Sequence, residues 1–339
     1  MTRSWSTIAA LVGFVAITAA CGKTESHTFA PSLADQTSAA PVSQAPARPA
    51  LAGPAEDPAA TRDYWTEERL AVAGHRDPDP RSADSSGGIP DNLRRTPGAD
   101  QYGLAPWPQS FADDSRSKAT GMLVFHDPKD DDDTHCSASV LATKSHRVVV
   151  TAAHCVSKGS ESRWYDHVAF VPAAGAVDSA QARPYGIWPV EQTWIPGDWF
   201  NPNSTATTDL ALLVLAAGPD GKNVQDVVGG LEPRINHAGE SFHDLTTLGY
   251  PAEPPYSGDV LQRCDGDGTD DPTFPGMIFT VNCAPLGGAS GGPATIPDPD
   301  RPGSFFVLGV LSTGTAPPKD AAFARLSPEI YGPLIEKVD

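Results

Sequence analysis

Basic residues are scarce in this chain of 339 residues, which has 24 Lys and Arg against 42 Asp and Glu and a formal net charge of −18. A nucleic-acid-binding surface needs concentrated positive charge, so this balance argues against a nucleic-acid partner. Long apolar runs are lacking beyond the first 21 residues, and no later run is long enough to span a bilayer. The length still allows a sizeable core together with accessory segments.

The N-terminus has the features of an export signal. Arg3 supplies positive charge, and the apolar run Ile8–Ala20 is shorter than the roughly 20 residues that cross a bilayer. Cys21 follows this run directly, which resembles a bacterial lipobox, where the cysteine is lipidated and becomes the mature N-terminus. We expect residues 1–21 to be a signal peptide and the protein to be extracellular, anchored through Cys21 to the outer face of the cytoplasmic membrane. The alternative is an ordinary cleaved signal in which Cys21 is lost or incidental.

Cysteine is also rare, and apart from Cys21 the chain has only Cys136, Cys155, Cys264 and Cys283. None of them lies in a C-x-x-C pair or a Cys/His cluster with ligand spacing, so no metal site is expected. Four cysteines allow three pairings. The most local one joins the first two and the last two, and each bridge would close a loop of about 20 residues, worth ~3 kcal/mol. Such bridges persist only in an oxidising compartment, which agrees with export.

Two regions of different amino-acid composition follow the signal peptide. Residues 22–117 are rich in Pro, Ala, Gly and Ser, so we expect a mostly irregular linker, with one short helix over Thr61–Ala73 that Thr66 can cap. From residue 118 onward, short β-type runs alternate with turn residues. These runs are Met122–Phe125, Ser137–Ala142, Arg147–Thr151, Val168–Val171, Leu210–Leu215, Leu245–Leu248, Met277–Val281 and Phe305–Leu311. With a single helical period after Ser327-Pro328-Glu329, the pattern predicts an all-β sandwich or paired barrels with a C-terminal helix.

The glycine-rich run Gly287–Pro293 surrounds Ser290. A serine hydroxyl needs a base to become a nucleophile, and flanking glycines let the backbone direct N–H groups at a developing oxyanion. The run also fits the nucleophile turn of α/β-hydrolases, but these place their histidine after the serine, and here no histidine follows His243. A subtilisin-type order needs the aspartate first, on a parallel sheet that the sequence does not suggest. The order His, Asp, Ser remains.

A histidine and an aspartate occur in that order. His154 ends a β-type run and is followed directly by Cys155, and Asp209 stands at the start of the apolar run Leu210–Leu215. A carboxylate in that position can accept a hydrogen bond from the imidazole and hold its tautomer. We therefore predict a catalytic triad of His154, Asp209 and Ser290.

These three motifs resemble the signatures of the chymotrypsin-like (trypsin-type) serine peptidases. The matching residues are Thr151–Cys155, Asp209–Leu212 and Gly288–Pro293, and the resemblance covers residues 118–339. With Gly249-Tyr250-Pro251 as a further match, the chain looks most similar to the secreted bacterial glutamyl-endopeptidase-like members. The resemblance implies two six-stranded antiparallel β-barrels with the triad between them.

The resemblance also implies roles for neighbouring residues. Cys136 and Cys155 would pair beside the histidine, and the backbone N–H groups of Gly288 and Ser290 would form the oxyanion hole. Ser312, Thr313 and Gly314 resemble the pocket-wall segment that pairs with the substrate backbone.

Three positions depart from the family pattern. Ala289 replaces the aspartate that receives a freed N-terminus in animal trypsins, so activation by N-terminal insertion is not expected. Ala284, six residues before the nucleophile, replaces the aspartate that selects Arg or Lys. Leu311 stands where glutamate-specific members have a histidine. A small or apolar residue before the scissile bond is therefore expected.

The acidic run Asp130–Asp133 could bind Ca²⁺, but EF-hand spacing is absent and a solvated loop is the simpler interpretation. Taken together, the sequence predicts an exported, monomeric serine endopeptidase that needs no metal or cofactor and acts on protein or peptide substrates. The alternatives are an esterase that uses the same triad, and a catalytically silent surface binding protein on a protease scaffold.

Overall fold

The structure is a computed structural model that describes residues 46–75, 89–175, 183–270, 276–314 and 320–339. The signal segment and Cys21 lie outside the described residues. Within these ranges, no helix combines the length and apolar character that crossing a membrane would require.

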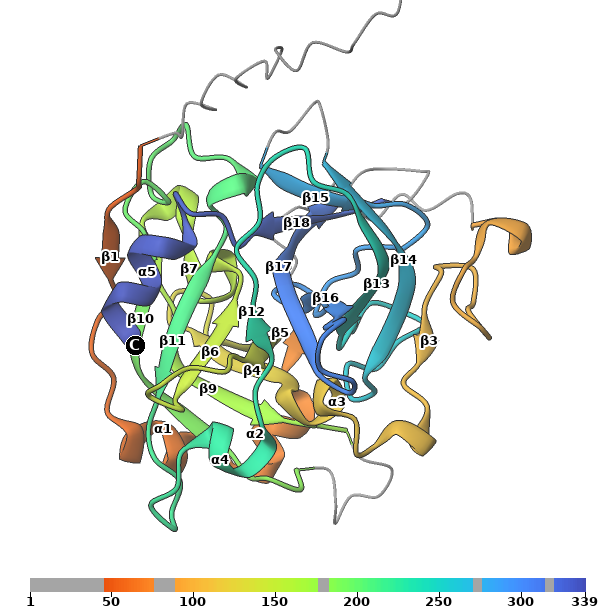
Figure 1. Cartoon of the computed structure of the whole chain (residues 1–339). Coiled ribbons are helices and arrows are strands. Elements are labelled where there is room, and N and C mark those ends of the chain that lie inside the picture. Colours follow the sequence, from red (N-terminus) through yellow and green to blue (C-terminus); the bar gives the residue numbers. More distant parts are fainter. Residues whose placement is uncertain (1–45, 76–88, 176–182, 271–275, 315–319) are drawn as a thin grey trace, which may run out of the picture. The chain divides into compact units, whose positions relative to one another are not determined.

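The first barrel, barrel 1, is a closed antiparallel sheet of six strands (Figure 1). Around it the strands follow the order β4, β5, β6, β11, β10, β9, and β9 pairs back with β4. Their bounds are β4 Thr120–Asp127, β5 Asp132–Val140, β6 Val148–Thr151, β9 Asp166–Pro172, β10 Trp188–Pro196 and β11 Ala211–Leu215.

The second barrel, barrel 2, closes in the same way through the order β13, β14, β15, β18, β17, β16. Its strands are β13 Phe242–Gly249, β14 Gln262–Asp270, β15 Met277–Thr280, β16 Pro293–Pro297, β17 Phe305–Gly314 and β18 Ala321–Arg325. The two six-stranded barrels implied by the motif resemblance are confirmed, and all eight β-type runs form strands of these sheets.

Strand β4 shows how one sequence serves both the barrel interior and the interface. Leu123 and Phe125 point into the core of barrel 1, whereas the intervening Val124 packs in a separate cluster with Leu248 and Tyr250 of barrel 2. All five residues are buried. Because side chains alternate along a strand, both faces of β4 are covered, and the two barrels share an apolar contact.

The remaining elements are short. The strands are β1 Ala50–Ala52, β2 Gly74–His75, β3 Ala105–Pro106, β7 Ser157–Lys158, β8 Arg163–Trp164 and β12 Glu232–Pro233. The α-helices are α1 Pro58–Tyr64, α2 Glu67–Val72, α3 Ser115–Ala119, α4 Val224–Val228 and α5 Tyr331–Val338, and the 3₁₀ turns are η2 Asp91–Leu93, η3 Gln109–Phe111, η4 Ala153–Cys155, η5 Gly159–Glu161 and η6 Ala206–Thr208. Helix α5 is the expected C-terminal helix, and its buried Leu334 and Val338 join the core of barrel 1.

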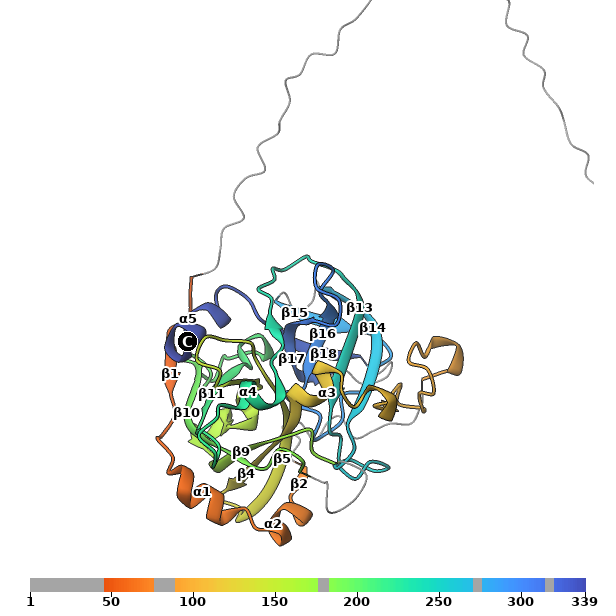
Figure 2. The ribbon, with the colours of Figure 1, turned by 60° about the horizontal axis from the view of Figure 1, so that its bottom comes forward.

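Residues 46–75, the N-terminal arm, pack along barrel 1 (Figure 2). Strand β1 pairs antiparallel with β10, and the Trp65 indole donates a hydrogen bond of 2.5 Å to the carbonyl of His167 in β9. The prediction of a single helix over Thr61–Ala73 was wrong. Two helices form, because Thr66 leaves the helical conformation and its hydroxyl caps α2 by accepting from the N–H of Arg69.

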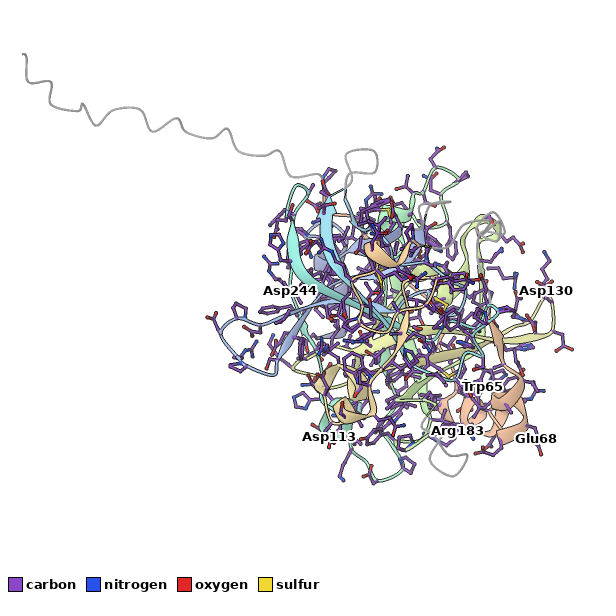
Figure 3. All side chains as sticks on the ribbon, turned by 90° about the vertical axis from the view of Figure 1, so that its right-hand side faces the viewer. Trp65, Glu68, Asp113, Asp130, Arg183 and Asp244 are labelled. Carbon is purple, nitrogen blue, oxygen red and sulfur yellow. A yellow bond between two sulfur atoms is a disulfide. The ribbon has the colours of Figure 1, made fainter. Side chains whose placement is uncertain are left out.

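The acidic residues lie mostly at the surface. Figure 3 shows Glu68, Asp113, Asp130 and Asp244 projecting from separate parts of the molecule, and all four are exposed. These four carboxylates face water on separate parts of the molecule.

Candidate active site

Strand pairing in barrel 1 brings His154 and Asp209 together. Antiparallel pairing of β6 with β11 sets Thr151 opposite Ala211, so the turn after β6 and the residues before β11 meet at the same edge. Asp209 Oδ2 lies 2.6 Å from His154 Nδ1, and Oδ1 accepts the backbone N–H of His154 at 2.9 Å. Asp209 is only 3% exposed, so water hardly competes for these contacts. The predicted pair is therefore in contact, and the imidazole is fixed with Nδ1 toward the carboxylate.

Ser312 makes a contact that the sequence did not predict. Its Oγ, from β17 of barrel 2, donates a hydrogen bond of 2.7 Å to Asp209 Oδ2. We expected this residue to line the substrate pocket, and the structure turns its hydroxyl toward the carboxylate. Asp209 thus accepts hydrogen bonds from both barrels.

Ser290 lies on the loop between β15 and β16, and contacts from both barrels fix its place. Its carbonyl accepts the N–H of Ser137 of β5 at 2.7 Å, and the next residue, Gly291, donates to the carbonyl of Leu311 at 2.7 Å. Gly291 has φ 78°, and a Cβ added there would lie 2.1 Å from Thr151 Oγ1. Only glycine allows this approach, which brings Ser290 up to the segment that carries His154.

The outer nitrogen of the imidazole is unpaired. His154 Nε2 is buried and has no hydrogen-bond partner among the described residues. Buried nitrogen atoms without a partner are uncommon in proteins and often lie at catalytic sites. With Nδ1 directed at Asp209, Nε2 is the ring nitrogen that can accept a proton.

The backbone around Gly288 has a fixed orientation. The Gly287 carbonyl accepts the N–H of Ala252 at 2.8 Å, and in a trans peptide the N–H of Gly288 then points the opposite way. The Gly288 carbonyl accepts the Ser137 hydroxyl at 2.8 Å. Within the described part of the chain, the N–H groups of Gly288 and Ser290 donate no hydrogen bond. Both predicted oxyanion-hole donors therefore lack an internal acceptor.

Two disulfides flank the site. Cys136 of β5 is bonded to Cys155, the neighbour of His154, and Cys264 of β14 is bonded to Cys283 on the Ser290 loop. The local pairing is confirmed. One group within the described ranges has metal-ligand proximity, Cys136, His154 and Cys155, and its two sulfurs belong to a disulfide rather than to thiolates.

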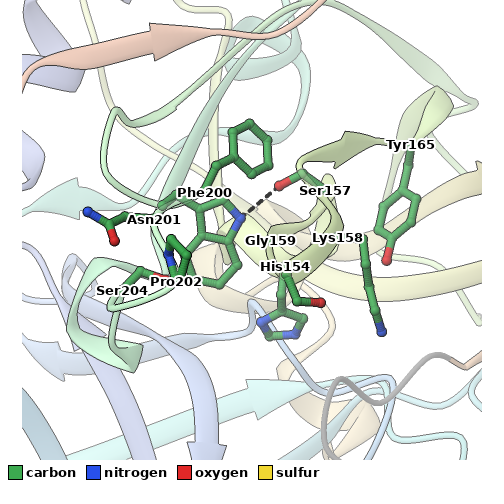
Figure 4. Close-up of a pocket in the computed structure, with 11 residues that line it drawn as sticks. His154, Ser157, Lys158, Gly159, Tyr165, Phe200, Asn201, Pro202 and Ser204 are labelled. Carbon is green, nitrogen blue, oxygen red and sulfur yellow. Dashed lines mark hydrogen bonds between the residues drawn. The ribbon is translucent and has the colours of Figure 1, made fainter.

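A cavity of about 440 Å³ lies beside His154. Residues 157–160, after the histidine, form one part of its lining, and residues 199–204, before η6, form another. The Trp199 indole donates a hydrogen bond of 2.9 Å to Ser157 Oγ and so links the two parts. Figure 4 shows Lys158 and Tyr165 on one side and Phe200 and Asn201 on the other, with His154 between them in this view. Among the described residues that line the cavity none is acidic; the full lining is His154, Ser157, Lys158, Gly159, Ser160, Tyr165, Trp199, Phe200, Asn201, Pro202 and Ser204.

The residues expected around the primary specificity pocket lie close together. Gly314 packs on Pro285, since a Cβ added at Gly314 would meet Pro285 Cγ at 1.9 Å. Ala284 precedes Pro285 and is 5% exposed, and Thr313 is half-buried beside Gly314. Of the predicted pocket residues, Ala284, Thr313 and Gly314 are thus close to Pro285, and the preference for a small or apolar residue stays a prediction.

The acidic loop lies at the turn between β4 and β5. Asp133 accepts hydrogen bonds from Tyr64 at 2.6 Å and from Arg69 at 2.7 Å, whereas Asp130 is exposed. Asp133 is thus used in holding the N-terminal arm.

The chain matches no protein-family model and no curated protein. Solved structures do match. A thermostable serine protease, AL20, from an extremophilic microorganism is 26% identical with a TM-score of 0.54, covering 63% of this chain and 94% of its own. The protease Anisep from Arthrobacter nicotinovorans is 27% identical with a TM-score of 0.53, covering 63% and 92%. A Glu endopeptidase is 15% identical with a TM-score of 0.50, covering 69% and 93%, and supports the fold alone.

The two closed barrels and these neighbours show that the chain has the chymotrypsin-like serine protease fold and resembles these proteases, as its motifs predicted. It is a hydrolase of the serine protease class.

Proposed function

We propose that this chain is an exported serine endopeptidase whose triad is His154, Asp209 and Ser290. The observation that carries the proposal is the Asp209 carboxylate, which binds both the ring and the backbone of His154 while Nε2 stays unpaired. This arrangement fixes the tautomer that can accept a proton from serine.

The proposed reaction has two stages. His154 Nε2 takes the proton of Ser290 as Oγ forms a bond to the carbonyl carbon of the scissile peptide. The N–H groups of Gly288 and Ser290 donate to the oxyanion. The tetrahedral intermediate breaks its C–N bond, the imidazolium gives its proton to the leaving amine, and an acyl-enzyme remains. Water attacks the acyl group in the same way, which releases the acid and restores the serine.

The substrate is proposed to be a protein or peptide with a small or apolar residue before the scissile bond. Ala284 and Gly314 support this preference, since neither supplies a charge for an ionic side chain. The cavity beside His154 is open to a further side chain of the substrate. Cleavage of a peptide library would reveal the preference, and a parallel panel of short acyl esters would separate a peptidase from an esterase.

Export and anchoring are part of the proposal. The disulfides next to His154 and Ala284 support an oxidising compartment. Lipidation of Cys21 is tested by the intact mass of the mature N-terminal peptide, where a mass without lipid would contradict it.

The triad is tested with a fluorophosphonate probe, which bonds to an activated serine. We expect the unsubstituted protein to be labelled and Ser290→Ala to be unlabelled. The matched control is Ser241→Ala, because Ser241 is an exposed serine in the loop before β13. Labelling that persists in Ser290→Ala would refute the triad. A folded, oxidised wild-type protein that does not react would favour the silent binding protein.

A further inference from the structure

Residues 89–107, the brace segment, lie on barrel 2 beside the loop that carries Ser290. In Figure 1 the segment runs along the outside of β14, where β3 pairs antiparallel with Gln262 and Arg263. Near its start, Thr96 is 3% exposed, and its hydroxyl accepts the N–H of Asp265 at 2.7 Å. At its end, the N–H of Trp107 donates to the Leu261 carbonyl at 2.8 Å. The segment is thus attached to β14 through Thr96 and β3, and to Leu261 just before that strand.

Between these two attachments the brace segment reaches the Ser290 loop. The carbonyl of Tyr102 accepts the N–H of Ala284 at 3.0 Å. Gly103 has φ 77°, and a Cβ added there would lie 2.0 Å from the carbonyl oxygen of Asn282. The two backbones are in close contact just before the nucleophile turn.

Leu104 adds an apolar side chain to the same region. It is 7% exposed and lies in one apolar cluster with Cys283, Ala284, Leu286 and Ala289. A small cavity of about 20 Å³ lies among these residues, and its lining includes Leu104, Ala284 and Ala289. That volume holds about one water molecule, so the loop has little room to move inward.

The turn that presents Leu104 is itself fixed. Asp100 accepts the N–H of Tyr102 at 2.8 Å, and its other oxygen accepts the hydroxyl of Tyr256. The N–H of Asp100 donates to the Leu104 carbonyl at 2.9 Å, which closes the turn. Leu104 is therefore held by a rigid turn rather than by a free strand end.

We propose that the brace segment positions the Ser290 loop, with Leu104 as a positioning residue that holds Ala289 and the adjacent oxyanion donors in place. The proposal rests on the proposed function. It assigns residues 89–107 to the working enzyme, as a support that the active protease retains rather than a propeptide that it discards.

The test compares Leu104→Ala with Leu245→Ala. Leu245 is fully buried in the same cluster. It serves as the control because it lies on β13 four residues before Gly249, the residue of that strand that approaches Ala289. Both variants remove the same side-chain volume from barrel 2, so both lower the melting temperature. We expect only Leu104→Ala to lower kcat, roughly 10- to 100-fold with a smaller change in KM, since small misplacements of reacting groups have effects of this size. Leu104→Met should restore kcat to within about threefold, because it conserves volume. Leu104→Val gives a milder variant if the alanine protein does not fold.

Hydrogen–deuterium exchange of the peptide covering residues 283–290 gives a readout that needs no activity. We expect faster exchange in this peptide for Leu104→Ala and wild-type exchange there for Leu245→Ala. Equal kcat in the two variants, or unchanged exchange in this peptide, would overturn the proposal. If the proposed function is wrong, the unsubstituted protein will not react with the fluorophosphonate probe. The exchange experiment does not depend on that result and still decides the role of Leu104.

Discussion

Barrel 1 carries His154 and Asp209 at the ends of paired strands, whereas barrel 2 carries Ser290 on a loop that leaves the sheet between β15 and β16. In barrel 1 the strand ladder itself sets the distance between the two side chains. In barrel 2 the loop is fixed by the disulfide at Cys283, the hydrogen bond from Ala252, and the brace segment. The difference shows that one half of the site follows from strand register and the other half from contacts made by distant segments.

The strongest test of the barrel 1 half is Asp209→Asn. An amide cannot accept all three of the hydrogen bonds made by His154 and Ser312, and it can stabilise the wrong imidazole tautomer. We expect kcat to fall on the order of 10⁴-fold, as for the equivalent change in other triads. The control is Asp130→Asn, an exposed carboxylate of the β4–β5 turn that should keep wild-type kcat. A loss below about tenfold for Asp209→Asn would contradict the proposed role.

The disulfides compare the two halves directly. Each closes a loop with a sequence separation of 19, so we expect Cys136→Ala/Cys155→Ala and Cys264→Ala/Cys283→Ala each to lower the free energy of unfolding by about 3 kcal/mol. Urea denaturation measures this loss.

Activity should separate the two double variants. In the first, Asp209 still holds His154 by two hydrogen bonds, so kcat of the folded protein should change only a few-fold. In the second, the Ser290 loop loses a covalent attachment, and kcat should fall roughly tenfold or more. Equal losses of kcat in the two double variants would contradict the view that the barrels hold their halves of the site in different ways.

The smallest expected effect concerns the N-terminal arm, the counterpart on barrel 1 of the brace segment. Burial raises the pKa of Glu56 from 4.5 to about 7, although its carboxylate accepts the N–H of Val168 at 3.0 Å. The nearby Thr61 hydroxyl donates to it, and the charge of Asp166 raises the pKa further. The folded state therefore holds a proton on Glu56 that the unfolded chain loses above pH 4.5.

The contribution of protonated Glu56 to stability is complete below pH 4.5 and is lost as the pH rises through 7. Glu56→Gln stays neutral and keeps an oxygen for Val168, so it should be more stable than wild type at pH 8 by roughly 1 to 3 kcal/mol. Thermal unfolding at pH 5 and pH 8 measures the difference. Glu68→Gln, at an exposed position of α2, is the control and should show no such pH dependence.

The sequence predicted most of barrel 1 and the contact between His154 and Asp209 because these depend on local signals. Apolar β-type runs mark β4, β6 and β11, and the glycines around Ser290 mark a turn that only glycine can form. Several strands carry no such signal. Strand β14 reads Gln-Arg-Cys-Asp-Gly-Asp-Gly-Thr-Asp, which is polar and glycine-rich, and β18 is mostly alanine. Their pairing with neighbours, rather than their own propensity, makes them strands.

Contacts between residues far apart in the chain could not be predicted from the sequence either. The brace segment has many prolines, glycines and aspartates, which in the sequence indicate a linker, yet Tyr102 reaches Ala284 far along the chain. The hydroxyl of Ser312 reaches Asp209 only because barrel 2 packs on barrel 1. No periodicity records such pairs, since each depends on the completed fold.

The hydrogen bond from Ala252 to the Gly287 carbonyl has a consequence for timing. The peptide that directs the Gly288 N–H is oriented as soon as that loop meets its neighbours, so activity needs no later rearrangement at this peptide. At this peptide, folding alone sets the orientation that the proposed reaction needs. Two disulfides, one beside His154 and one beside Ala284, add to the stability of this folded state wherever thiols are oxidised. With the proposed export, the site would therefore resist unfolding better outside the cell than in the compartment where the chain is made.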